Sequence, residues 1–146
     1  MIIQETDFLK ARKLIRENQG KEIIFSSNND DLSRQVLEKE KITVLLLNLE
    51  GRKDKVKQED SGFNHVLSRE AKKNNVAIGI NLDEIINSNK KEKALILGRI
   101  QQNIELCNKK KLKMKFISPS GIERNIYDLK ALGLVLGMPT WMTKNL

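Results

Sequence analysis

Short apolar runs alternate with amphipathic stretches along the chain. The apolar runs predict strands at about 1–4, 23–25, 42–47, 76–80 and 112–117. Apolar residues at helical spacing predict helices at about 6–19, 61–73, 90–110 and 126–136, and another carrying Leu32, Val36 and Leu37. Repeated strand–helix units joined by short loops predict an α/β fold with a parallel sheet and right-handed crossovers.

Capping residues predict where these helices begin and end. The expected N-caps are Thr6, Asn29 or Asp30, Ser61 and, with the spacing of a capping box, Asn81 and Glu84. Glycine adopts the left-handed conformation that closes a helix, so ends are expected at Gln19-Gly20 and at Gly137. The longest helix should bury a stripe formed by Ala94, Leu97, Ile100, Ile104 and Cys107.

Two predicted strands differ in polarity. Ile42–Leu47 is almost continuously apolar, as expected for a parallel strand covered on both faces. In 112–117 polarity alternates, so one face carries Lys113 and Lys115. Together with Lys109, Lys110 and Lys111, these lysines could bind along a phosphate backbone. The alternative is that they interact with the negative end of a helix dipole and protect an exposed edge strand.

The length of 146 residues predicts one domain, 1–146, with one core. The sequence contains no run of about 18 apolar residues, so it predicts no membrane-spanning segment. Gln4, Glu5 and Asp7 interrupt the amino-terminal stretch where a secretory signal is apolar, which indicates a cytoplasmic location. The single cysteine, Cys107, excludes an internal disulfide and a cysteine-built zinc site, and we place it in the core.

The net charge of +8 is concentrated in one part of the chain. Residues 1–60 hold 12 basic and 12 acidic side chains, whereas 61–146 hold 15 basic and 7 acidic ones. Such a basic half indicates a polyanionic partner whose phosphates are neutralised by lysine and arginine. The alternative is a set of solvated helix faces, and composition favours neither.

The chain lacks the usual catalytic motifs, namely a P-loop, a dinucleotide glycine fingerprint, a nucleophile elbow and a metal-spaced histidine pair. We therefore predict no catalytic residue and no metal ligand. The single histidine, His65, is expected near the end of the sheet where ligands bind, in a packing or hydrogen-bonding role. Asp54, Asp60, Asp83 and Asp128 lie in or beside loops, where capping is their ordinary role. These residues alone predict a basic α/β domain that binds RNA.

Several segments, taken in order, resemble a known family. Gly51-Arg52-Lys53-Asp54 is followed by Ser61-Gly62-Phe63-Asn64-His65-Val66-Leu67 and then by Asn75-Val76-Ala77-Ile78. The closing segments are Asp128-Leu129, Leu132-Gly133 and Gly137-Met138. Over about 40–138 this order and spacing resemble the archaeal ribonuclease P protein component 3 family.

The chain departs from that family at three places. Six extra residues, Lys55 to Asp60, separate the first two segments, Asn64 replaces the usual aspartate, and Ile126 stands where proline is common. The family is similar to a TIM-like barrel of the metal-dependent phosphoesterase kind. Five predicted strands against the eight of such a barrel imply a short, incomplete or reduced barrel.

The resemblance implies a subunit of ribonuclease P, which removes the 5′ leader from precursor tRNA. It implies catalysis by the RNA subunit with Mg²⁺, no cofactor on the protein, and as partners the catalytic RNA, protein component 2, the other protein subunits and, indirectly, precursor tRNA. The candidate RNA-binding residues are Arg52, Lys53, Lys109, Lys110, Lys111, Lys113, Lys115 and Arg124. The motif residues with structural roles are Gly62, Asn64, His65, Asp128, Gly133 and Gly137.

Two other classes of function remain open on the sequence. A stand-alone metal-dependent phosphoesterase is suggested by the barrel analogy and opposed by the single histidine. A protein-interaction module without RNA would make the positive charge incidental.

Overall fold

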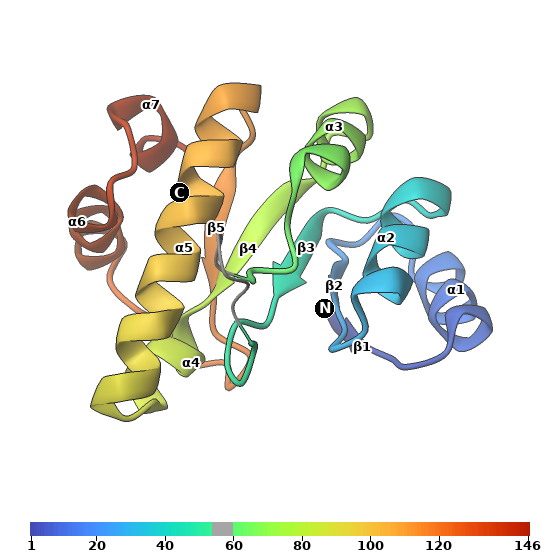
Figure 1. Cartoon of the computed structure of the whole chain (residues 1–146). Helices are drawn as coiled ribbons and strands as arrows, with labels where there is room; N and C mark the ends of the chain where they lie inside the picture. The colour runs from blue at the N-terminus through green and yellow to red at the C-terminus, as the bar shows by residue number, and fades with distance from the viewer. Residues whose placement is uncertain (54–59) are drawn as a thin grey trace.

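A computed structural model describes residues 1–53 and 60–146 as alternating strands and helices (Figure 1). The strands are β1 (Ile2–Gln4), β2 (Ile24–Ser26), β3 (Val44–Leu47), β4 (Ala77–Asn81) and β5 (Met114–Ile117). The helices are α1 (Phe8–Glu17), α2 (Asp30–Lys39), α3 (His65–Lys73), α4 (Leu82–Asn87), α5 (Lys90–Lys110), α6 (Ile126–Leu136) and α7 (Thr140–Thr143). Asp54 and the inserted residues before Asp60 lie outside the described residues.

The five strands form one parallel sheet in the order β1-β2-β3-β4-β5. Neighbours in sequence are therefore neighbours in the sheet, as in a TIM barrel. Within the described residues, β1 and β5 each pair on one side only, so the sheet is open. The α/β fold and the incomplete, TIM-barrel-like sheet are both confirmed.

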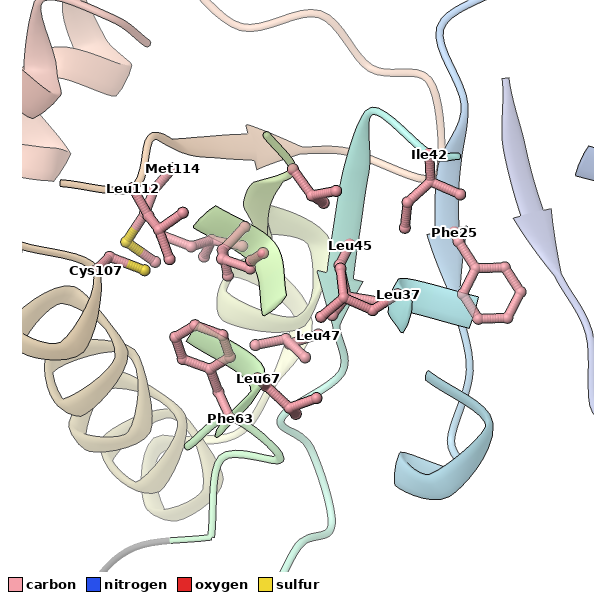
Figure 2. Packing of buried hydrophobic residues seen from close by; sticks show 14 of the residues in the cluster. Phe25, Leu37, Ile42, Leu45, Leu47, Phe63, Leu67, Cys107, Leu112 and Met114 are labelled. Atoms are coloured by element: carbon pink, nitrogen blue, oxygen red, sulfur yellow. The ribbon is translucent and has the colours of Figure 1, made fainter. Parts of the chain in front are cut away.

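The two faces of the sheet are buried in different ways. One face packs against the helices, and Figure 2 shows Leu45 and Leu47 of β3 near Leu37 of α2 and Leu67 of α3. On the other face, Ile24, Val44 and Leu46 pack against further strand residues, and no helix of the described residues joins this cluster. Because right-handed crossovers between successive parallel strands carry the connecting helices to the same side, this asymmetry follows from the strand order.

Several helix boundaries differ from the prediction. The N-cap of α1 is Asp7 rather than Thr6, and α1 ends at Glu17 before the Gln19-Gly20 pair. Ser61 does not open α3, because its side chain is buried in a turn in which its hydroxyl accepts from the Phe63 N–H at 3.4 Å. Asn64 caps α3 instead, accepting from the Leu67 N–H at 3.0 Å. The position where the family carries aspartate is thus an N-cap here.

The buried face of α5 also differs from the predicted stripe. Ile100, Ile104 and Cys107 are buried, but Ala94 is exposed and Arg99 is buried in the same face. Cys107 is fully buried, which confirms its place in the core, and this burial raises the pKa of its thiol to about 12.

The Asn81–Glu84 capping box is only half formed. Asn81 accepts from the Glu84 N–H at 3.3 Å. The Glu84 carboxylate does not reach back to Asn81 and instead accepts from the Leu49 N–H at 2.8 Å.

Close packing at the carboxyl terminus depends on glycine. A side chain at Gly133 would lie 2.8 Å from Met138 Sδ and 3.3 Å from Thr143 Cγ2, so the segment after α6 packs closely against this position. Gly137 closes α6 with a φ of 102°, as predicted, and Met138 N–H donates to the Gly133 carbonyl at 2.9 Å. Asp128 lies in the first turn of α6, where its negative charge interacts favourably with the helix dipole.

Among the described residues, no helix is long and apolar enough to cross a membrane.

Candidate nucleic-acid interface

Lysines gather at the amino ends of β3, β4 and β5. Lys109 and Lys110 form the last turn of α5, Lys113 directly precedes β5, and Lys115 lies within it. A pocket of about 220 Å³ there is lined by Lys72, Lys111, Lys113 and Lys115, with Thr43 and Asn75 between them. We call the following set the basic amino-end surface: Lys72, Lys73, Lys109, Lys110, Lys111, Lys113 and Lys115.

The sequence did not identify Lys72 and Lys73 as part of this surface. Both lie in the last turn of α3, and Lys72 Nζ donates to the Lys111 carbonyl at 3.2 Å. Two helices far apart in sequence thus end beside each other, at the top of Figure 1. Lysines in the last turn of a helix interact favourably with the helix dipole whether or not they bind a ligand. Their position at a helix end was therefore only a weak signal of an RNA-binding role.

The basic amino-end surface is a concentration of uncompensated charge. Within 1–53 and 60–146, none of its lysines forms an ion pair with a carboxylate. Lys111 has a left-handed φ of 55°, and its ammonium lies 5.3 Å from the centre of the Trp141 ring. Trp141 Nε1 donates to Asn108 Oδ1 at 2.9 Å, so α7 braces this turn. Unpaired cations on a braced turn suit a polyanionic ligand.

The remaining RNA-binding candidates lie elsewhere. Arg52 and Lys53 follow β3, and Arg124 follows β5, so all three belong to the opposite, carboxyl end of the sheet. The Arg52 guanidinium donates to both Asp30 oxygens at 2.9 Å, and its Nε donates to the Asn48 carbonyl at 2.6 Å. Burial lowers the pKa of Arg52, but its bonds to Asp30 raise it overall. Arg52 is an internal brace in this structure, whereas Lys53 and Arg124 are exposed.

A buried arginine that the sequence did not reveal holds the loop after β3. Arg99 is 1% exposed and donates to the carbonyls of Leu49 and Arg52, both at 2.6 Å. Glu92 Oε1 accepts from the Gly51 N–H at 2.8 Å and lies 3.6 Å from Arg99 Nη1. Burial raises the pKa of the Glu84 carboxyl, which accepts from this loop. Three charged side chains from α4 and α5 thus fix the Gly51-Arg52 turn.

Gly62, in the second segment of the family resemblance, lies close to Arg52 of the first segment. Its φ is 69°, and a side chain there would lie 2.6 Å from Arg52 Nη2. We expect Gly62→Ala to lower the free energy of unfolding by about 2 kcal/mol, because left-handed strain adds to displacement of Arg52. Gly20→Ala is the matched control, since Gly20 also has a positive φ, 91°, but no atom within 4 Å. Equal losses in urea denaturation of the two variants would contradict the contact with Arg52.

His65 is not at the strand ends where we expected it. It is the first residue of α3, is exposed, and shares a pocket of about 220 Å³ with Gln102, Glu105 and Lys109 of α5. The chain from Asp60 to Asn64 carries it there, beside α5. Its structural role stays a prediction.

The described residues contain no group of three or more His, Cys, Asp or Glu side chains that could hold a metal ion. This finding gives no support, in that part of the chain, to the metal-dependent phosphoesterase alternative.

Comparison with known proteins points to one family. No family model matches the chain. It is 28% identical over 140 residues to ribonuclease P protein component 3 of Methanothermobacter thermautotrophicus, covering 94% of this chain and 54% of that protein. It is 30% identical over 121 residues to the protein of the same name from Methanococcus vannielii, covering 82% and 48%. The chain thus spans about half the length of the curated relatives it matches.

The fold agrees with this relationship. A chain in the cryo-EM structure of archaeal ribonuclease P with mature tRNA superimposes with a TM-score of 0.77 at 23% identity, covering 98% of this chain and 62% of that chain. Over most of its length, the chain is thus similar in sequence to archaeal ribonuclease P protein component 3.

Proposed function

We propose that the protein is a subunit of ribonuclease P and supports a catalytic RNA that removes the 5′ leader from precursor tRNA. The relationship to component 3 supports the complex. The basic amino-end surface, whose lysines lack carboxylate partners within the described residues, is the observation that carries the RNA-binding role. Its proposed ligand is the phosphate backbone of that RNA, in the cytoplasm.

In this proposal the RNA, with its own Mg²⁺, performs the chemistry, and the protein holds no cofactor. We expect the purified protein alone not to cleave precursor tRNA at the mature 5′ end. The measurement is gel analysis of end-labelled precursor tRNA with protein and Mg²⁺. Specific cleavage that is lost on replacing a residue of this chain would contradict the proposal and favour a phosphoesterase.

The proposed protein partner, component 2, needs a surface distinct from that of the RNA. Tyr127, Leu134 and Val135 on α6 are 76%, 56% and 79% exposed, and Ala131 lies between them at helical spacing. A helix that is apolar on its outer side is typical of one covered in an assembly. We propose that component 2 covers this side of α6.

We expect Val135→Lys to weaken binding of component 2 at least tenfold, because binding would bury an unpaired ammonium. Leu9→Lys is the matched control, since Leu9 is 70% exposed on α1. Isothermal titration with purified component 2 measures both affinities. If Val135→Lys binds as tightly as the wild type, component 2 does not use this side of α6.

Co-purification tests the proposal as a whole. Tagged protein, incubated with purified catalytic RNA and component 2, should retain both after washing. Retention of neither would contradict a place in ribonuclease P.

A further inference from the structure

A polar pocket lies at the carboxyl ends of β1, β2 and β3, at the opposite end of the sheet from the basic amino-end surface. It encloses about 460 Å³. Amides and hydroxyls dominate its lining, which includes Gln4, Thr6, Ser26, Asn28 and Asn48. Ligands of open parallel sheets bind at this end of the strands.

A hydrogen-bond network fixes the floor of the pocket. Asn48 Nδ2 donates to Ser26 Oγ at 2.8 Å and to Asn28 Oδ1 at 3.3 Å. Asn48 Oδ1 accepts from Asn81 Nδ2 at 3.2 Å, and Ser26 is fully buried. These bonds define the orientation of the Asn48 amide, so the floor is ordered before any ligand arrives.

Other groups of the lining are available to a ligand. Gln4 and Asn28 are exposed. Within 1–53 and 60–146, the Gln4 amide and the amide protons of Asn28 have no hydrogen-bond partner. Each side-chain amide carries an NH2 donor and a carbonyl acceptor on the same carbon, so the two groups lie side by side.

The charge of the lining selects among ligand classes. Among residues 1–53 and 60–146, no lysine or arginine lines the pocket, and the one charged lining residue is Glu5, a carboxylate. Phosphate is therefore disfavoured here, and one carboxylate among amides is a poor set for a divalent cation. The Watson–Crick edge of an unpaired nucleobase is uncharged and carries adjacent donors and acceptors, which side-chain amides complement.

We infer that this pocket binds one unpaired nucleobase of an RNA. The inference rests on the proposed function, because it assigns the phosphates and a base of one RNA to opposite ends of the sheet. The lysines supply affinity that depends on salt concentration. The amide pocket supplies a preference for a single strand that carries bases over a strand without bases.

The test compares two ligands: a ten-nucleotide RNA containing all four bases and an abasic strand of the same length. We expect wild-type protein to bind the RNA roughly tenfold more tightly. Gln4→Ala combined with Asn28→Ala should remove this preference and leave the salt slope unchanged. Gln35→Ala combined with Asn87→Ala is the matched control, because both residues are exposed amides outside the pocket. An unaltered preference in the Gln4 and Asn28 variant would overturn the inference while leaving phosphate binding intact.

A second measurement does not depend on phosphate binding. Free nucleosides at millimolar concentration should shift the side-chain amide NMR resonances of Gln4 and Asn28, and not those of Gln35 and Asn87. Absence of these shifts overturns the base pocket. Loss of salt-dependent binding to both strands, with the nucleoside shifts present, would instead contradict the proposed function.

Discussion

Replacing Lys109, Lys110, Lys113 and Lys115 together by alanine should flatten the salt dependence of RNA binding by roughly two to four units of log K against log salt concentration. Each phosphate contact contributes slightly less than one unit, because each neutralised phosphate releases a counterion. Affinity at physiological salt should fall roughly tenfold or more. Lys111 is left in place because it contacts Trp141. Fluorescence anisotropy across a series of salt concentrations measures the slope and the affinity.

The control removes the same charge elsewhere. Lys10 and Lys13 on α1, with Lys90 and Lys91 at the start of α5, are exposed. Their fourfold alanine variant should keep a slope close to that of the wild type, because these lysines lie outside the basic amino-end surface. Equal slopes for the two variants would show that only net charge matters, and that the lysines before β5 are a solvated edge.

Replacing Arg99 by methionine should lower the free energy of unfolding by about 3 kcal/mol. The variant keeps a long apolar stem but leaves the carbonyls of Leu49 and Arg52 without their donor and Glu92 without a nearby cation. Urea denaturation followed by circular dichroism measures the loss.

Lys91→Met on the same helix is the control and should stay within about 0.5 kcal/mol of the wild type, since Lys91 is exposed. If Arg99→Met were equally mild, the loop after β3 would not depend on this arginine. The Gly51-Arg52 turn would then need another explanation for its fixed position.

Periodicity alone predicted most of the fold. The alternation of apolar runs and helical stripes located all five strands, and α5 and α6 begin and end where predicted. The start of α3 was wrong because Gly62 allows a turn, and the chain from Asp60 continues beside α5 before the helix begins. Arg99 was missed because its position on a helix does not reveal that two backbone carbonyls 47 and 50 residues away need its protons.

The site was predicted in part. Lysines before a strand and arginines after one must lie at opposite ends of a parallel sheet, so the sequence order already separates Lys113 from Arg52. The pairing of Arg52 with Asp30, which lies 22 residues away, depends on the tertiary structure. The same holds for the approach of Lys72 to Lys111, because it requires α3 and α5 to end side by side. The RNA contacts of these residues stay predictions.

Reconstituted processing tests the central proposal most directly. Catalytic RNA and the other protein subunits would be assembled at limiting Mg²⁺, and cleavage of precursor tRNA at the mature 5′ end measured with and without this protein. We predict that the wild type raises the cleavage rate, that the four-lysine variant raises it less, and that the control with Lys10, Lys13, Lys90 and Lys91 replaced matches the wild type. A rate unchanged by the wild-type protein would contradict its assignment as a subunit that supports the catalytic RNA.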